Sequence, residues 1–243
     1  MNKNTTKIIN TFKQRANTYN TDGKWVNNIE TIEPLVPQSF GNTRLLDICS
    51  GTGAIANVAH SKGWQVFALD ITATMLQEIT NNDIIKIVSS FEKLPFLDNY
   101  FDVITLRQGL QYSTNLDETI LECKRVAKSQ IKFGHITVFE KDDINWWTNY
   151  FKIASPGRKH IFKPNEIYKN CSKHNFNKVN QTVRIFKDSF INPLRYLNKK
   201  QINELFCLIN NAPKHIIDNY QFKKLDNGDF SYLHRWEFIT INC

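Results

Sequence analysis

The chain has 243 residues, of which 41% are hydrophobic and 22% charged, a composition typical of globular proteins that excludes disordered and collagen-like classes. This length suits one α/β domain with excursions, so we expect residues 1–243 to form a single domain. The formal net charge is +8, but the basic residues are scattered, which favours an acidic small molecule over nucleic acid as the partner.

Three features of the sequence bear on the compartment in which the protein works. The first residues, MNKNTTKIINTFKQ, lack the apolar stretch of a signal peptide, and no window reaches the roughly 18 apolar residues that span a bilayer. The five cysteines are odd in number and include no C-x-x-C pair, as is typical of a reducing compartment. We therefore expect a cytoplasmic protein without a membrane span.

Short apolar runs alternate with helical patterns from residue 44 onward, which predicts parallel strands joined by crossover helices. The expected strands are Arg44–Cys49, Gln65–Leu69, Ile84–Val88, Phe101–Leu106, a fifth ending near Phe139, Lys178–Lys187 and Tyr232–Ile241. Near-continuous hydrophobicity in the early strands is typical of parallel strands buried on both faces. The fold class that follows is a doubly wound α/β domain.

Helices are expected between and after these strands. They comprise one from the glycine loop to Gly63, one after Asp70, one capped by Asn115, one carrying Trp146 and Trp147, and two at Ile202–Ile209 and His215–Tyr220. We expect the core at approximately residues 41–140 and 175–243. Segments of approximately 1–40, 141–165 and 188–228 are expected to form a lid.

The most informative stretch is LLDICSGTGAIA, residues 45–56, in which a strand and an acid precede two glycines and a helix. Glycine at positions 51 and 53 permits a tight turn and a close approach of the backbone to a ligand. The segment also satisfies the dinucleotide fingerprint, as Gly51-x-Gly53-x-x-Ala56, with Asp70 placed to bind ribose hydroxyls. A nicotinamide-dependent oxidoreductase is therefore one alternative.

Two further features favour a different ligand. Asp47 lies beside the glycine loop, where a carboxylate suits an ammonium or sulfonium group and repels a pyrophosphate. Downstream, the segment SFEKLPF at residues 90–96 is followed by NYFDVI at residues 99–104. Over roughly Arg44–Lys128, these motifs together resemble the class I S-adenosylmethionine-dependent methyltransferases, in particular the group that includes the ubiquinone and menaquinone C-methyltransferases.

The resemblance implies a Rossmann-like, mostly parallel seven-stranded sheet with an antiparallel last strand, S-adenosyl-L-methionine as cofactor, S-adenosyl-L-homocysteine as product, and no metal. In that family the acid matching Asp47 holds the methionine amino group, and the acid matching Asp70 holds the ribose hydroxyls. The cofactor-binding residues that it implies are Asp47, Cys49, Gly51, Gly53, Asp70, Ile71, Met75, Ser90, Phe91 and Arg107. The chain departs from the family pattern in having Ser90 for the usual acid and Cys49 where a loop glycine is common.

The acceptor site is less clearly marked, because transfer from a sulfonium is an in-line displacement that depends mainly on positioning. No catalytic residue is therefore assigned. The acceptor-pocket candidates, from loops at the carboxyl ends of strands and from the lid segments, are Tyr19, Arg107, Gln108, Gln111, Tyr112, Trp146, Trp147, Arg158 and His160. Arg158 and its basic neighbours could hold a carboxylate or phosphate, with a solvated turn as the alternative; for the tryptophans the alternative is helix packing.

These observations predict an S-adenosylmethionine-dependent methyltransferase that acts on a small-molecule acceptor. Methylation at carbon, oxygen or nitrogen remains open. An RNA-modifying methyltransferase, suggested by the +8 charge, is the alternative beside the oxidoreductase. A zinc site built from His160, Cys171 and His174 is disfavoured, because the sequence offers no fourth ligand at a useful spacing.

Overall fold

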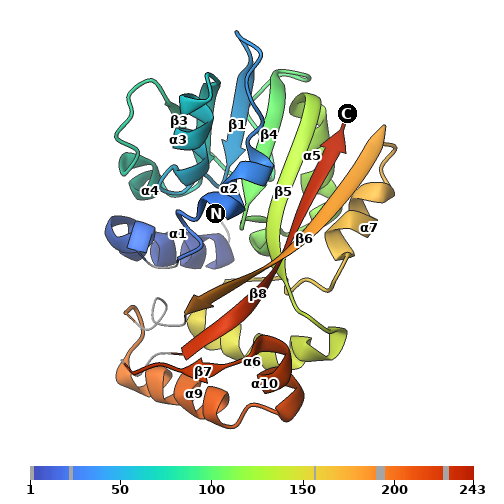
Figure 1. The fold of residues 1–243 in the computed structure, drawn as a ribbon. Coiled ribbons are helices and arrows are strands. Elements are labelled where there is room, and N and C mark those ends of the chain that lie inside the picture. The colour runs from blue at the N-terminus through green and yellow to red at the C-terminus, as the bar shows by residue number, and fades with distance from the viewer. Residues whose placement is uncertain (1–2, 22–23, 156, 190–194, 227–229) are drawn as a thin grey trace.

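One twisted sheet organises the structure, a computed structural model that describes residues 3–21, 24–155, 157–189, 195–226 and 230–243 (Figure 1). Its strands are β1 (Arg44–Ile48), β2 (Gln65–Asp70), β3 (Ile85–Val88), β4 (Phe101–Arg107), β5 (Ala127–Thr137), β6 (Lys178–Ser189), β7 (Lys223–Lys224) and β8 (Phe230–Asn242). Their spatial order is β3-β2-β1-β4-β5-β8-β6, and β7 also pairs with β8. The parallel pairing of β1 to β5 and the antiparallel β8 confirm the predicted doubly wound sheet.

The predicted strands are all present, with ends that differ by one or two residues from the pattern. Residues 45–48 of β1 and 66–69 of β2 are continuously buried, which explains why these strands read as unbroken apolar runs. The two-residue strand β7 was not predicted. It lies in an expected lid segment, and its two lysines carry no apolar signal.

The helices of the described residues flank this sheet and extend beyond it. They are α1 (Lys3–Arg15), α2 (Ile29–Ile32), α3 (Ala54–Ser61), α4 (Ala73–Gln77), α5 (Leu116–Val126), α6 (Ile144–Ala154), α7 (Glu166–Ser172), α9 (Lys199–Asn210) and α10 (Lys214–Tyr220). Asn115 caps α5 as predicted, since its side chain accepts a hydrogen bond from the backbone N of Asp117 at 3.1 Å. Gly63, with φ of 83°, follows the end of α3.

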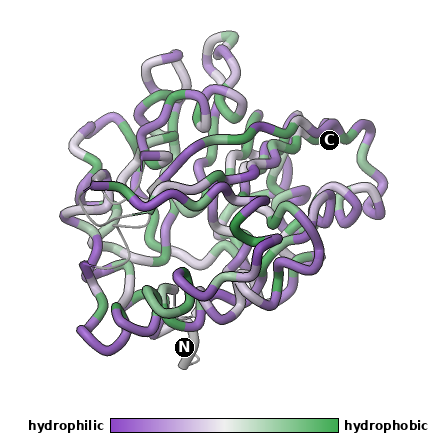
Figure 2. Tube along the Cα trace, turned by 60° about the horizontal axis from the view of Figure 1, so that its bottom comes forward, coloured by the Kyte–Doolittle hydropathy of each residue, from purple (hydrophilic) through white to green (hydrophobic). Residues whose placement is uncertain are grey.

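Separate apolar cores cover the two faces of the sheet. Ile55 and Ala59 of α3 are buried in the core on one face, and Ile120 of α5 and Ile167 of α7 are buried in the core on the other. Figure 2 shows the hydrophobic stretches running through the interior of the molecule and hydrophilic ones on the outlying loops. These cores hold the carboxyl ends of β1, β2 and β4 in fixed positions.

A second lobe, formed by α6, α9, α10, β7 and the start of β8, lies below the sheet in Figure 1. It has its own core, in which Trp147 and Tyr150 of α6 pack with Ile209, Tyr220 and Tyr232. Helix α1 packs against α4 and lies between the strand ends and this lobe (Figure 1). Parts of the expected lid, residues 1–2, 22–23, 156, 190–194 and 227–228, lie outside the described residues. None of the helices in the described ranges combines the length and apolarity that a membrane crossing requires.

Candidate functional site

Two neighbouring pockets open at the carboxyl ends of the parallel strands. The strand-end pocket, of about 1020 Å³ including its mouth, lies against the ends of β1, β2 and β4 and is covered by α1. The aromatic pocket, of about 1060 Å³ including its mouth, lies between the sheet and the second lobe. The residues that line both pockets are Phe12, Tyr19, Trp25, Gln108 and Tyr112. A molecule in one pocket would therefore face a molecule in the other across this shared wall.

The glycine loop after β1 forms the floor of the strand-end pocket. Gly51 has φ of 55°, and a Cβ there would lie 3.3 Å from Met75 Cε. At Gly53, with φ of 84°, a Cβ would lie 2.7 Å from Ile79 Cγ1, closer than real carbon contacts allow. Both glycines are thus required by backbone conformation, and Gly53 also by packing, which leaves the pocket floor open to a ligand.

Asp47 lies at the bottom of the strand-end pocket with only 1% of its surface exposed. Its Oδ1 accepts a hydrogen bond from Thr105 Oγ1 at 3.0 Å, whereas its Oδ2 is buried and has no hydrogen-bond partner among the described residues. Burial raises the pKa of Asp47 to about 6, an effect that hydrogen bonds and the charge of Arg107 only partly offset. A buried carboxylate oxygen without a donor is well suited to bind a cation or an N–H group.

Asp70, at the end of β2, supports the glycine loop from the other side. Its Oδ2 accepts a hydrogen bond from the backbone N of Gly51 at 3.0 Å, and its Oδ1 accepts one from the backbone N of Thr72 at 2.8 Å. Burial raises the pKa of this carboxyl despite these bonds. The side chain still lines the pocket, and each carboxylate oxygen retains acceptor capacity for a hydroxyl group.

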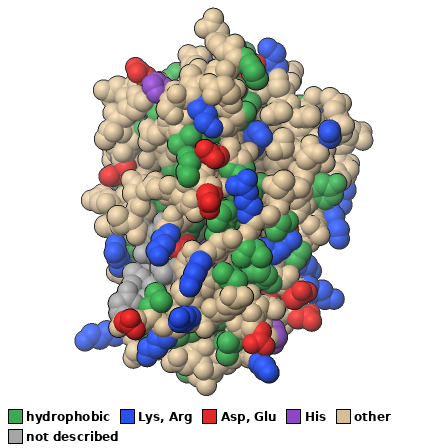
Figure 3. Space-filling view, viewed as in Figure 1, with side chains coloured by type: hydrophobic (Ala, Val, Ile, Leu, Met, Phe, Trp, Pro, Cys, Tyr) green, Lys and Arg blue, Asp and Glu red, His purple; other side chains and the backbone are tan. Residues whose placement is uncertain are grey.

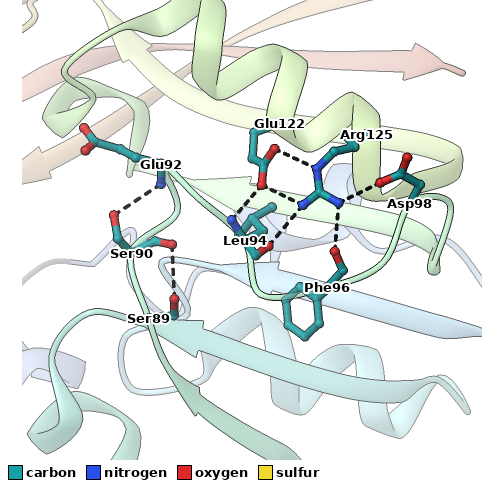
Figure 4. Close-up of polar contacts among 8 residues, drawn as sticks. All are labelled: Ser89, Ser90, Glu92, Leu94, Phe96, Asp98, Glu122 and Arg125. Carbon is teal, nitrogen blue, oxygen red and sulfur yellow. Dashed lines mark hydrogen bonds and ion pairs between the residues drawn. The ribbon is translucent and has the colours of Figure 1, made fainter.

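Residues 89–99, which follow β3 and supply a wall of the pocket, are fastened to α5 by one arginine (Figure 4). Arg125 donates to the backbone oxygens of Leu94 at 3.0 Å and Phe96 at 2.8 Å. The same guanidinium pairs with Glu122 at 2.7 Å, and Glu122 Oε1 accepts a hydrogen bond from the backbone N of Leu94 at 2.7 Å. The sequence analysis did not identify this pair; its signal is the i, i+3 spacing of the two charges on one helix.

Arg107 fastens the N-terminal segment over the strand-end pocket. Its guanidinium donates to the backbone oxygens of Trp25 at 3.2 Å and Val26 at 2.7 Å, and to Thr31 Oγ1 at 2.8 Å. Burial lowers the pKa of Arg107 to about 10, so the side chain remains charged at neutral pH. It lines the strand-end pocket and not the aromatic pocket.

The structure gathers most of the other predicted site residues around the two pockets. The strand-end pocket is lined by Asp47, Cys49, Gly51, Asp70, Ile71, Met75, Ser90, Phe91 and Arg107, with Gly53 placed behind the floor at the start of α3. The aromatic pocket is lined by Tyr19, Gln108, Gln111, Tyr112, Trp147 and Arg158. Trp146 lines neither, since it is buried in the core of the second lobe beside Trp147, and His160 lies in an outer groove.

Several pocket residues escaped the sequence analysis. Ile8 and Phe12 of α1 cover the strand-end pocket, and His234 of β8 reaches the aromatic pocket together with Asp188 of β6. Their positions depend on long-range packing and are marked by no local motif. Among the described residues, no group of three or more His, Cys, Asp or Glu side chains is arranged to hold a metal ion.

The fold and the strand-end pocket define a class of protein: a doubly wound α/β domain whose ligand pocket lies where the strand order reverses, beside β1. Residues 46–133 match the family described as "Methyltransferase domain". The match covers little more than a third of the chain, and within this segment the chain is similar to S-adenosylmethionine-dependent methyltransferases.

Individual proteins resemble the chain over part of its sequence or in its fold. Over 107 residues the chain is 38% identical to the ubiquinone/menaquinone biosynthesis C-methyltransferase of Burkholderia mallei, a match that covers 40% of this chain and 42% of that protein. The YcgJ protein of Bacillus subtilis has a similar structure, with a TM-score of 0.75, 17% identity, and coverage of 89% of this chain and 97% of that one. Phosphoethanolamine N-methyltransferase 2 of Haemonchus contortus has a TM-score of 0.61 at 16% identity, covering 90% and 52% of the two chains. The chain spans about two fifths of the length of the curated relative, and the structural likenesses show a shared fold.

Proposed function

We propose that this chain is a methyltransferase that binds S-adenosyl-L-methionine in the strand-end pocket and transfers the methyl group to a small molecule in the aromatic pocket. The family match supports the type of reaction. Two relatives named for quinone biosynthesis and for phosphoethanolamine support a small acceptor. The shared wall supports the geometry, because an acceptor must approach the methyl carbon to within about 3 Å.

The residues of the strand-end pocket fit this cofactor. Asp47 Oδ2, buried and without a donor, matches the need of an α-ammonium group for a carboxylate. Gly51 leaves free the space that a Cβ would fill near Met75. Asp70 lies on the neighbouring strand, two residues beyond Ala68, the register partner of Asp47, and could accept hydrogen bonds from ribose hydroxyls while it holds the loop.

When bound, S-adenosyl-L-methionine supplies a methyl group on a positively charged sulfur. The contribution of the chain is to orient both molecules and to exclude water. Asp47 and Asp70 would hold the two ends of the cofactor, while Ile8 and Phe12 of α1 would cover it. Gln108 and Tyr112, which line both pockets, would face the reacting atoms, and we propose that α1 and the second lobe form the walls that select the acceptor.

The observation that carries this proposal is the unpartnered, buried carboxylate oxygen of Asp47 at the floor of a glycine-lined pocket. Calorimetric titration of the chain with S-adenosyl-L-methionine and S-adenosyl-L-homocysteine is the direct test. Replacing Asp70 by Ala should weaken both by about 1.5–3 kcal/mol, the usual value of a hydrogen bond to a charged acceptor. Because Asp70 also holds the loop, Asp70→Asn is the gentler companion variant, and Asp83→Asn, on an exposed loop, is the control.

Unchanged affinity in both Asp70 variants would refute the role of that residue. Absence of binding to the unmodified chain would refute the proposed function itself. The oxidoreductase alternative finds no support in the family match. For the RNA alternative, Figure 3 shows lysine and arginine side chains dispersed over the visible face and interspersed with acidic ones, instead of gathered into one stripe.

A further inference from the structure

Aromatic rings form a large part of the walls of the aromatic pocket. These rings belong to Phe12, Tyr19, Trp25, Tyr112, Trp147, Tyr150, Phe151, Tyr220 and Tyr232. Aromatic walls of this kind favour a flat, apolar body that can stack on them or meet their edges. The pocket volume of about 1060 Å³, mouth included, is ample for a molecule of one or two rings.

Two arginines line this pocket: the guanidinium of Arg15 lies over the rings of Phe12 and Tyr19, and Arg158 has hydrogen-bonding capacity for a new partner. Its Nε donates to the backbone oxygen of His160 at 2.9 Å, and its guanidinium carbon lies 4.0 Å from the centre of the Phe151 ring. Within the described residues no carboxylate lies within 4.0 Å of it. Burial lowers the pKa of Arg158 to about 10, which leaves the side chain charged at neutral pH.

A partly buried guanidinium without a counter-ion gains from a ligand that completes it. The pocket also contains Arg15, Asp188 and His234. Asp188 Oδ2 lies 3.7 Å from His234 Nδ1, and burial together with the charge of Arg158 lowers the pKa of His234 to about 3, so this imidazole is neutral. Because Asp188 forms no ion pair with Arg158, the immediate surroundings of the Arg158 guanidinium are positive and rich in rings.

The surface next to this pocket also carries positive charge. Arg158 also lines an open groove on the surface, and the lysines of that groove are Lys7, Lys152, Lys159 and Lys163. The acidic member, Glu166, accepts a hydrogen bond from the backbone N of Lys163 at 2.9 Å. A positive groove next to a positive pocket attracts anions and raises their rate of association.

We propose that the acceptor is an aromatic acid: a flat ring held by the aromatic walls, with one anionic group bound by Arg158. The ring edge away from that group would then face Gln108 and Tyr112 at the wall shared with the strand-end pocket. This assignment rests on the proposed methyltransferase function and narrows its substrate class. It also explains why the lining combines many rings with a guanidinium that has no carboxylate within 4.0 Å among the described residues.

The test is binding to the chain saturated with S-adenosyl-L-homocysteine. The probes are hydroxybenzoates and hydroxynaphthoates, their uncharged amides, and the corresponding aryl phosphates, each titrated by calorimetry. The acids should bind about tenfold more tightly than their amides or better, as expected for a charged hydrogen-bonded pair. Tighter binding of the aryl phosphates than of the acids would support the same anion site and identify phosphate as its group.

Variants of Arg158 then test whether this side chain causes the preference for acids over amides. Arg158→Gln should abolish the preference for acids while leaving the affinity for S-adenosyl-L-homocysteine unchanged, and Arg158→Lys should retain part of it. Arg184→Gln is the matched control, because Arg184 is exposed on β6 and lines none of these pockets. Its preference should equal that of the unmodified chain.

Equal affinity for acids and amides in the unmodified chain would overturn the inference without any variant. A preference that survives Arg158→Gln, or the failure of every acid and phosphate in the set to bind, would also overturn it. These failures are distinct from failure of the proposed function, which would appear as absence of S-adenosyl-L-homocysteine binding in the unmodified chain.

Discussion

The proposed contact between the buried carboxylate of Asp47 and the cofactor predicts that cofactor affinity depends on pH. Its pKa of about 6 means that about nine tenths of the molecules carry the charge at pH 7, but only about one tenth at pH 5. If the ionised form binds the α-ammonium group, affinity for S-adenosyl-L-homocysteine should fall about tenfold between these pH values, or about 1.4 kcal/mol. The sign follows because binding favours the ionised form, so protons compete with the ligand as the pH decreases.

Calorimetry offers a second measure of the same event. At about pH 6, where half of the Asp47 side chains are protonated, binding should release about half a proton, seen as a dependence of the heat on the ionisation enthalpy of the buffer. Asp47→Asn keeps the acceptor for Thr105 but removes the charge, so it should weaken binding at neutral pH and flatten the profile. Asp70, whose pKa is also raised, accounts for any residual slope. A flat profile in the unmodified chain, or an equal slope in Asp47→Asn, would refute the reasoning; Asp83→Asn serves as the control.

Three further predictions concern the supports of the site. Gly53→Ala should lower the free energy of unfolding by about 2–4 kcal/mol, because the residue has a left-handed φ and its new Cβ would overlap with Ile79. Gly41→Ala, at φ of 83° but with no neighbour within 4 Å, should lower it by only about 1–2 kcal/mol. Urea denaturation measures both losses, and equal losses would contradict the packing argument. Arg125→Gln should speed amide hydrogen exchange in residues 89–99 and weaken S-adenosyl-L-homocysteine binding several-fold, with Arg184→Gln unaffected; unaltered exchange would count against the fastening role. Burial lowers the pKa of His234 to about 3, so the folded chain keeps this imidazole neutral while the unfolded chain protonates it. Between pH 6 and pH 5 the unmodified chain should therefore lose about 1 kcal/mol more free energy of unfolding than His234→Gln. Identical pH profiles of the two proteins would disprove this.

The parts of the fold that the sequence predicts well are those in which neighbouring residues determine the structure. The alternation of apolar runs with helical patterns predicted the strands from Arg44 onward, because strands buried as continuously as β1 and β2 require an unbroken apolar run. The glycine loop could also be predicted, because residues other than glycine rarely adopt the positive φ found at Gly51 and Gly53. In both cases the physical constraint acts within a few residues of the chain.

The acceptor side could not be predicted in the same way, because its walls come together from distant segments. Arg107 is an example: the sequence places it near the strand ends, where it is the last residue of β4, but its guanidinium donates to Trp25, Val26 and Thr31, more than 75 residues away in the sequence. Trp146 and Trp147 are adjacent in sequence, yet only Trp147 reaches the pocket, since successive side chains of a helix point in directions about 100° apart.

Arg158 differs from most charged side chains of the two pockets in the partners that it finds within the chain. Most charged side chains of this site have hydrogen-bond partners within the chain. Asp70 accepts from two backbone amides, Arg107 donates to three oxygens, and Arg125 donates to the loop at residues 89–99. Asp47 in the strand-end pocket and Arg158 in the aromatic pocket are charges whose described neighbours leave binding capacity unused. They are of opposite sign and lie on either side of a shared wall. A cationic cofactor at one and an anionic acceptor at the other would satisfy both, with the ends that are to react placed between them.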